Sequence, residues 1–192
     1  MNTEFEATFI DINPDEIRQK LTDLGAKLVY PEKLMRRIVF HPPASIPGGW
    51  MRVRDEGDKI TLSLKVVAGE NITDQKEIEL KIDNFEEGMR LLEAIGARKK
   101  AYQETKREKW EYEKCDITID TWPGLDPFSE IESSISEAEV KAVSQKLELD
   151  YSQAIFGSVE VIYEQKLGIP PEVINNQTPE ITFKNPPKSR YN

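Results

Sequence analysis

Residues 50–54 read Trp-Met-Arg-Val-Arg, a stretch in which charged and apolar side chains alternate. A period of two is that of a β-strand, in which successive side chains point to opposite faces of the sheet. The pattern places Arg52 and Arg54 on one face of a predicted strand, roughly 6–7 Å apart, and Met51 and Val53 on the other. One face of this strand is therefore doubly charged, while the other is suited to a hydrophobic core.

The same alternation occurs in other segments of the chain. It predicts strands at residues 4–10, 35–40, 60–66, 76–82, 106–112, 116–121 and 128–132. Their charged faces repeat the arrangement, because charged side chains again stand two residues apart: Glu4 and Glu6, then Glu77, Glu79 and Lys81, then Glu130 and Glu132. Short polar turns such as residues 55–58 join neighbouring strands, as in antiparallel hairpins.

Helices are predicted between these strands, at residues 14–24, 85–95, 137–147 and 151–167. The first follows Asn13 as its N-cap, has Pro14 at the first helical position and ends at Gly25. Residues 1–168 are predicted to form one folded domain. Residues 169–192 are rich in proline and asparagine and have little periodicity, so they are predicted to be an extended or disordered tail.

The charged strand faces have two interpretations. For any one strand, a solvated face opposite a core face is the ordinary explanation. However, Arg-x-Arg and Glu-x-Glu differ from the mixed polar residues of a typical wet face, and the pattern recurs on most of the strands. If the sheet closes, the charged faces line an interior that holds water and a ligand. An antiparallel barrel of about eight strands with helices packed outside is therefore one of the two possibilities.

Composition narrows the classes of function. The formal net charge is −9 and there is no basic block, so nucleic-acid binding is not expected. Cys115 and His41 are the only cysteine and histidine, which disfavours a disulfide, a zinc cluster or a Ser-His-Asp triad. Without a long apolar run or a signal-like N-terminus, we expect a cytoplasmic protein that does not enter a membrane. Any chemistry must then use carboxylates, guanidinium groups, lysines and bound metal.

A barrel interior lined with carboxylates and arginines is suited to a metal–polyphosphate complex. Clustered carboxylates repel one another, and a hard divalent cation such as Mg²⁺ or Mn²⁺ relieves that repulsion. Arginines offer planar pairs of donors to phosphate oxygens. The expected ligand is therefore a small-molecule polyphosphate held with Mg²⁺ or Mn²⁺.

A set of short motifs occurs in order along the chain: Glu4-Phe5-Glu6, Met51-Arg52-Val53-Arg54, Leu62-Ser63-Leu64-Lys65, Glu77-Ile78-Glu79, Arg107 before Trp110, Ile119-Asp120-Thr121-Trp122-Pro123-Gly124-Leu125 and Phe128-Ser129-Glu130-Ile131-Glu132. In their order and spacing these motifs resemble the CYTH superfamily of triphosphate tunnel metalloenzymes, which includes class IV adenylate cyclases and thiamine triphosphatases. The resemblance spans roughly residues 1–165 and implies an α+β fold, a closed eight-stranded antiparallel barrel or tunnel with helices packed outside.

The resemblance also implies roles for these side chains. Those that look like metal ligands are Glu4, Glu6, Asp120, Glu130 and Glu132. Those that look like phosphate ligands are Arg52, Arg54, Lys65 and Arg107. The residues expected to take part most directly in catalysis are Glu130, Glu132, Asp120 and Arg107, whereas Glu77 and Glu79 are expected to line the tunnel.

Two positions depart from the family pattern. Thr8 and Thr105 stand where the family usually has lysine. The lost positive charge can be replaced by Arg36 or Arg37, although strand alternation lets only one of these two point inward. Lys81 is a further candidate for phosphate binding because it shares a strand face with the acidic pair before it.

Several functions remain open at this stage. The leading hypothesis is metal-dependent hydrolysis of inorganic triphosphate or of an organic triphosphate. Formation of cyclic AMP from ATP, as in class IV adenylate cyclases, is an alternative that uses the same tunnel. The two threonines motivate another alternative, a polyphosphate- or nucleotide-binding module without turnover. A plain barrel with a solvated charged face is a further alternative, and homodimer formation is left open.

Overall fold

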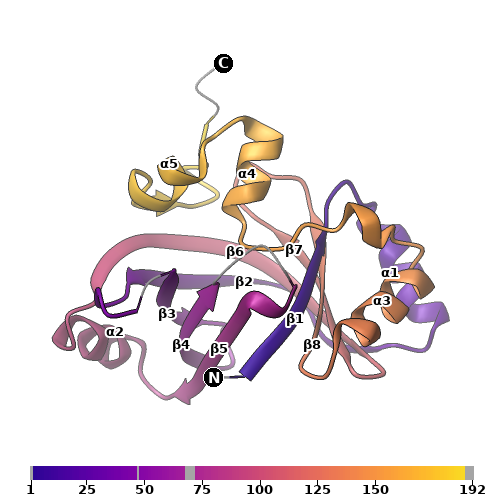
Figure 1. Cartoon of the computed structure of the whole chain (residues 1–192), viewed down its shortest axis with the longest axis horizontal. Helices are drawn as coiled ribbons and strands as arrows, with labels where there is room; N and C mark the ends of the chain where they lie inside the picture. Colours follow the sequence, from indigo (N-terminus) through magenta and orange to yellow (C-terminus); the bar gives the residue numbers. More distant parts are fainter. Residues whose placement is uncertain (1, 47, 68–71, 189–192) are drawn as a thin grey trace.

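The computed structural model describes residues 2–46, 48–67 and 72–188 (Figure 1). Hydrogen-bonded neighbours follow the order β2-β3-β4-β5-β1-β8-β7-β6, and pairing of β6 with β2 closes the ring. The predicted closed antiparallel barrel of eight strands is therefore confirmed. The strands are β1 (Asn2–Phe9), β2 (Lys27–His41), β3 (Gly49–Asp55), β4 (Ile60–Val67), β5 (Gln75–Ile82), β6 (Arg98–Tyr112), β7 (Cys115–Thr121) and β8 (Phe128–Ser133).

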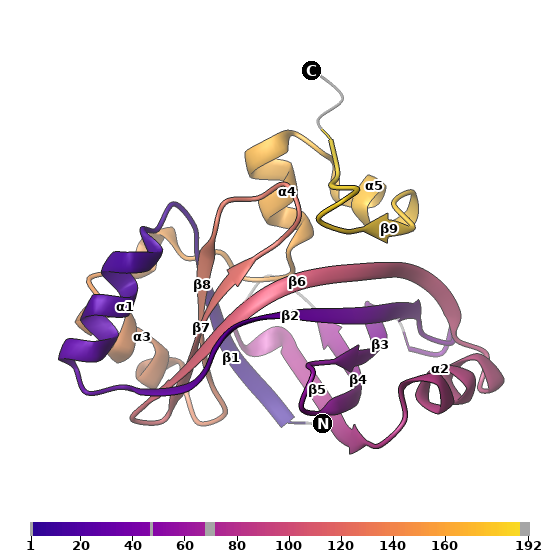
Figure 2. The same cartoon turned by 180° about the vertical axis from the view of Figure 1, so that it is seen from behind.

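Strands β2 and β6 are much longer than predicted, at 15 residues each. They pair with each other along most of their length and form the long upper wall in Figure 2. The prediction missed residues 27–34 because this part of β2 is mostly exposed and does not alternate. Register irregularities on both sides of Tyr30 interrupt the pairing there.

The main hydrophobic core lies outside the barrel, between the sheet and the helices. Helices α1 (Pro14–Asp23) and α3 (Glu137–Lys146) belong with the outward side chains of β1, β7 and β8 to one buried apolar cluster. Helix α2 (Phe85–Ala94) covers β2, β3 and β4 in a second cluster. The first turns are fixed by N-caps, since Asn13, Asn84 and Ser136 each accept a hydrogen bond from a backbone N–H of the helix that follows.

The helix predicted at residues 151–167 is interrupted. A short 3-10 turn at Tyr151–Gln153 is followed by an extended segment, and α4 begins only at Glu160 and ends at Leu167. The extended segment is held by β1, because the backbones of Thr8 and Ile155 exchange two hydrogen bonds of 3.0 and 2.9 Å. Gly157 has a φ of 127°, which side-chain-bearing residues rarely adopt, so the chain bends there before the helix.

The predicted tail folds onto the barrel, which corrects the expectation of an extended or disordered segment. Helix α5 (Pro171–Asn176) packs beside α4, and β9 (Glu180–Ile181) pairs in parallel with β6 (Figure 2). These elements complete a third apolar cluster, in which Ile174 and Ile181 are buried. Elements of six and two residues are too short to produce a readable periodicity. Residues 189–192 of the predicted tail lie outside the described residues.

Among the described residues, no helix combines the length and apolar character that crossing a bilayer requires.

We predict that the folded tail contributes to global stability. The Ile181→Ala substitution removes a side chain that is 0% exposed, and we expect it to lower the free energy of unfolding by about 2–4 kcal/mol. Phe183→Ala is the control, because Phe183 is 37% exposed and its loss should cost less than about 1 kcal/mol. Urea denaturation followed by circular dichroism measures both. Equal, small effects would mean that β9 is not part of the cooperative core.

Candidate functional site

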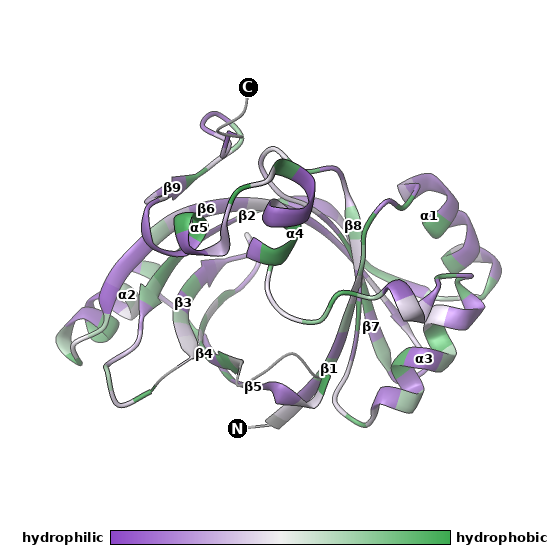
Figure 3. Cartoon of the chain, turned by 45° about the horizontal axis from the view of Figure 1, so that its top comes forward, coloured by the Kyte–Doolittle hydropathy of each residue, from purple (hydrophilic) through white to green (hydrophobic). Residues whose placement is uncertain are grey.

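A cavity of about 260 Å³ lies inside the barrel. Its wall is formed by inward side chains of the strands, and the segment before α4 lies across one end (Figure 3). The structure brings most of the predicted site residues together in this one lining. They are Glu4, Glu6, Arg37, Arg52, Arg54, Lys65, Glu77, Glu79, Arg107, Glu130 and Glu132.

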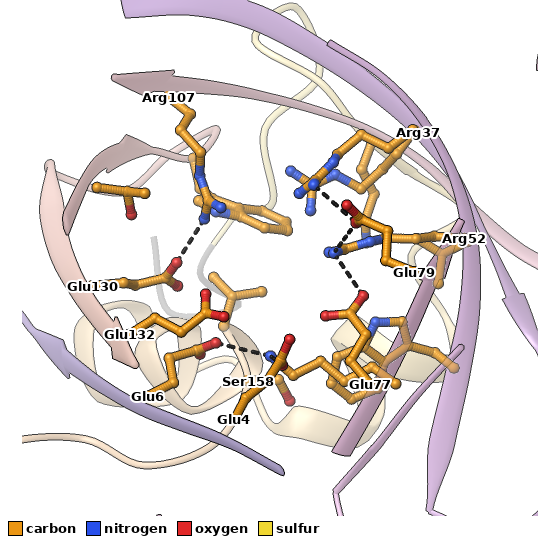
Figure 4. Close-up of a pocket in the computed structure, with 18 of the residues that line it drawn as sticks. Glu4, Glu6, Arg37, Arg52, Glu77, Glu79, Arg107, Glu130, Glu132 and Ser158 are labelled. Carbon is orange, nitrogen blue, oxygen red and sulfur yellow. Dashed lines mark hydrogen bonds and ion pairs between the residues drawn. The ribbon is translucent and has the colours of Figure 1, made fainter. Parts of the chain in front are cut away.

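One wall of the cavity is acidic (Figure 4). Glu6 of β1 is the direct cross-strand partner of Glu132 of β8, and Thr8 is the partner of Glu130. Burial, together with the neighbouring Glu6 carboxylate, raises the pKa of Glu132 above its ordinary value. Burial also raises the pKa of Glu130 to about 8. These shifts mean that the site disfavours several negative charges at once unless a cation accompanies them.

A lysine partly neutralises this acidic wall. The Lys65 Nζ lies 2.8 Å from Glu6 Oε2 and 3.2 Å from Glu4 Oε2. Burial alone would lower the pKa of Lys65, but the Glu6 and Glu4 carboxylates outweigh it and hold the pKa above its ordinary value. Burial raises the pKa of Glu4 to about 8 even with the lysine present. One ammonium group is therefore not enough to neutralise the acidic side chains.

The opposite wall is basic (Figure 4). Arg37 of β2 and Arg54 of β3 are direct cross-strand partners. The Arg52 guanidinium lies 3.1 Å from a Glu77 carboxylate oxygen. Burial opposes ionisation of Glu77, but the charges of Arg52 and Lys65 outweigh it and lower the pKa of Glu77 to about 2. Glu77 is thus a permanently charged partner that orients the basic wall.

Arg54 is held at the end of the basic wall by two carboxylates. Its Nη2 lies 2.7 Å from Glu56 Oε1 and 3.3 Å from Glu79 Oε2. The Arg54 Nε is buried and has no hydrogen-bond acceptor within the described part of the chain. Burial and the nearby Arg52 charge lower the pKa of Arg54.

Arg37 has the least compensated charge on this wall. It is 6% exposed, and its Nη2 donates a hydrogen bond of 2.5 Å to the Thr105 hydroxyl. Its guanidinium also lies 4.9 Å from the centre of the Trp122 ring. Among the described residues no carboxylate forms an ion pair with Arg37, and its buried Nε has no acceptor. Burial and the neighbouring arginines lower the pKa of Arg37 well below its ordinary value.

Arg107 is held by two carboxylates. Its Nε and Nη2 donate to the two carboxylate oxygens of Asp120 at 2.6 and 2.8 Å, and Nη2 also donates to Glu130 at 2.6 Å. Burial opposes the charge of Arg107, but Asp120 and Glu130 outweigh it and raise the pKa well above its ordinary value. This guanidinium is therefore permanently charged and fixed in orientation.

Three predicted site residues do not line the cavity. Asp120 is 1% exposed and lies behind Arg107, where it also accepts a hydrogen bond of 2.6 Å from Thr118. Lys81 is exposed at the end of β5, beyond the cavity. Arg36 points outward, where it pairs with Asp55 at 2.9 Å, because successive residues of a strand point to opposite faces.

The cavity also contains residues that the sequence analysis did not select. Glu56 and Lys109 continue the i+2 series of Arg54 and Arg107, so this periodicity was a signal that could have identified them. Tyr30 gave no signal, because its direction depends on the irregular pairing of β2. The other unselected polar residues of the lining are Lys59, Lys100, Gln103, Asp116, Thr118, Ser158, Glu160 and Asn175.

The acidic wall has the donor chemistry of a divalent-cation site. Within the described residues, no three carboxylate, imidazole or thiol side chains are gathered tightly enough to form a preassembled metal cluster. However, Glu4 Oε2 is buried and lies near Lys65 without the geometry of a hydrogen bond, so this oxygen is not satisfied. Buried carboxylate oxygens that face one another are the ligands that Mg²⁺ and Mn²⁺ prefer. The residues present therefore fit such a cation.

Solved structures similar to this chain share its fold at low sequence identity. A conserved hypothetical protein from Pyrococcus furiosus is 20% identical, with a TM-score of 0.65 over 79% of this chain and 94% of its own. A Vibrio parahaemolyticus protein described as a candidate adenylate cyclase is 14% identical, with a TM-score of 0.71 over 85% and 98%. A Hippeastrum protein described as an adenylyl cyclase candidate with a dominant triphosphatase activity is 17% identical, with a TM-score of 0.57 over 90% and 99%.

None of the curated proteins matches the sequence. The family profile of the CYTH domain matches residues 3–159, which include all of the barrel strands except Asn2 and contain the acidic and basic walls. The chain therefore belongs to the CYTH domain family.

Proposed function

We propose that this protein binds a triphosphate-bearing small molecule together with Mg²⁺ or Mn²⁺ inside the barrel and hydrolyses it. One observation carries the proposal: two cross-strand pairs face the same cavity, one made of two positive side chains and the other of two negative side chains. They are Arg37 with Arg54, and Glu6 with Glu132. Like charges directly opposite in a sheet are destabilising, and their burial increases the cost. An anion bound to the arginine pair and a cation bound to the glutamate pair would relieve the repulsion within each pair.

The basic wall is suited to the phosphate groups. Arg52 and Arg54 are oriented by Glu77 and Glu79, so their guanidinium groups are placed before a ligand arrives. Arg37 and Arg54 each retain an unsatisfied Nε inside the cavity wall. Phosphate oxygens are good acceptors for such donors, because charged hydrogen bonds to guanidinium are short and strong.

The acidic wall is suited to the cation. Glu6, Glu130 and Glu132 would hold it, with Glu4 beside them; Asp120 is instead assigned to orienting Arg107. When bound, a divalent cation neutralises phosphate charge, polarises a phosphoryl oxygen and makes a coordinated water more acidic. Lys65 would be released from the carboxylates and could turn its ammonium group toward the phosphates.

Arg107 is the residue that we assign to charge stabilisation during phosphoryl transfer. Asp120 holds its guanidinium from behind at 2.6 Å, so the group needs little reorganisation. Preorganised positive charge lowers the free energy of a transition state in which negative charge moves onto the transferred phosphoryl group and the leaving oxygen. The triphosphatase activity named for the Hippeastrum neighbour is consistent with this reading.

We predict divalent-cation-dependent phosphate release that requires the acidic wall. Purified protein is incubated with Mg²⁺ or Mn²⁺ and inorganic triphosphate or ATP, and phosphate, pyrophosphate and cyclic AMP are measured. We expect Glu132→Gln and Glu130→Gln to lower phosphate release by roughly 100-fold or more, because they remove anionic ligands from the cation site. The two variants should also bind Mn²⁺ more weakly in calorimetry.

The control for this experiment is Glu93→Gln, which makes the same chemical change at an exposed position on α2. It should leave release and Mn²⁺ affinity unchanged. Normal turnover in Glu132→Gln would contradict the assignment. Cyclic AMP and pyrophosphate from ATP would identify a cyclase, whereas thermal stabilisation without any product would identify a binding module.

We predict that Arg37 contributes to triphosphate binding and that the adjacent Arg36 does not. Arg37→Met should weaken the affinity for inorganic triphosphate by roughly 10- to 100-fold, because a buried charged hydrogen bond is lost. The same substitution should raise the melting temperature of the ligand-free protein, since it removes a buried charge that faces Arg54. Thermal shift titrations with and without triphosphate and Mg²⁺ measure both effects.

Arg36→Met is the matched control, because Arg36 lies on the same strand but outside the cavity. We expect its triphosphate affinity to equal that of the unmodified protein. If both variants bind triphosphate equally well, Arg37 is not a phosphate ligand.

A further inference from the structure

The end of strand β5 has an open backbone edge. Strand β4 pairs with β5 from Gln75 to Ile82, whereas β1 pairs with it only from Gln75 to Glu77. Within the described residues, no strand pairs with residues 78–82 on the β1 side. In Figures 1 and 2 this end of β5 lies at the rim of the barrel, before the loop to α2. Alternate N–H and C=O groups of this edge therefore have no strand partner.

The outer face of the same edge is apolar, and two of its side chains are exposed. Ile78 is 43% exposed and Leu80 is 56% exposed, whereas Ile82 on the same face packs partly against α2. The inward face carries Glu79 and Lys81. A strand edge that combines unpaired backbone groups with exposed aliphatic side chains is a template for pairing with another strand.

We propose that this edge pairs with the same edge of a second copy of the chain, in an antiparallel arrangement about a two-fold axis at Leu80. In that register Leu80 faces Leu80 of the partner copy, and Ile78 faces Ile82. Glu79 of each copy then faces Lys81 of the other, so the dimer gains two opposite-charge cross-strand pairs. Directly opposite side chains in a sheet have Cβ atoms about 4.5–5.5 Å apart, within ion-pair reach for glutamate and lysine.

Charge selects this register over its neighbours. Paired residues of two antiparallel strands share a face, so a two-fold axis must pass through a residue, and the centres one residue away are Glu79 and Lys81. A centre at Glu79 places two glutamates opposite each other, and a centre at Lys81 places two lysines opposite each other. Both alternatives are repulsive. The sequence Ile78-Glu79-Leu80-Lys81-Ile82 is thus complementary to itself about its central residue.

The surroundings of the Lys81 side chain also support a second copy of the chain as the partner. Among the described residues Lys81 has no ion-pair partner, although it lies on a strand where the neighbouring inward residues, Glu77 and Glu79, are both paired with Arg52. A lysine on an edge can serve to prevent pairing. Here Glu79 stands two residues away. It already pairs with Arg52 at 3.7 Å and Arg54 at 3.3 Å, and in the dimer it also faces Lys81 of the other copy. Because the other edge of β5 is occupied by β4, the pairing closes as a dimer and does not propagate.

Analytical ultracentrifugation of the full chain over roughly 1–200 µM tests the proposal, since so small an interface should have a micromolar dissociation constant. We expect a concentration-dependent monomer–dimer equilibrium. Lys81→Glu and Leu80→Asp should each shift it to monomer, the former by creating two glutamate–glutamate pairs. A Leu80→Cys variant should form a disulfide-linked dimer under mild oxidation, because the two Leu80 positions face each other.

The matched control is Leu91→Asp, since Leu91 on α2 is 55% exposed, nearly as much as Leu80. It should leave the dimer intact, and Leu91→Cys should not form a cross-link. Circular dichroism melting of each variant checks that an exposed substitution has not unfolded the chain. A protein that is monomeric throughout the concentration range overturns the proposal. A dimer that persists in Lys81→Glu and Leu80→Asp also overturns it, because another surface would then form the interface.

Discussion

The interior of this barrel is filled with charges that cannot all be satisfied by one another, and this constraint governs the rest of the structure. Arg37 faces Arg54 across one pair of strands, and Glu6 faces Glu132 across another. Lys65 relieves part of the acidic repulsion, and Glu77 relieves part of the basic repulsion. The remaining repulsion within the positive wall and within the negative wall would be relieved by a bound anion and a bound cation, respectively.

An interior of this kind contributes little to folding, so the stabilising contacts lie elsewhere. Two of the three apolar clusters are formed by outward side chains of the strands with helices. The third lies where Trp122 and Phe128 pack against α4 and the C-terminal elements. Burial of apolar surface there, at about 25 cal/mol per Å², must offset the cost of burying charges inside. The same strands thus carry the hydrophobic core on one face and the candidate site on the other.

Because each strand has an apolar face and a charged face, its position and the direction of its side chains could be predicted from the sequence. Period-two alternation identified the strands and placed Arg52 and Arg54 on the inward face correctly, and the same rule required one of Arg36 and Arg37 to point outward. It could not identify Tyr30, whose direction depends on irregular pairing with β6. It also could not place Asp120 behind Arg107, because that arrangement depends on side-chain geometry between strands. The short elements after residue 168 lack any period, and long-range packing alone determines them.

The two-faced strands also restrict how such a chain can change in length. Inserting or deleting one residue inside a strand would exchange its two faces beyond that point. Carboxylates and guanidinium groups would then enter the apolar clusters, while aliphatic side chains would enter the cavity. Length variation should therefore be confined to the loops and to the C-terminal elements. Changes in ligand preference, by contrast, need only replace inward side chains without changing the length of a strand.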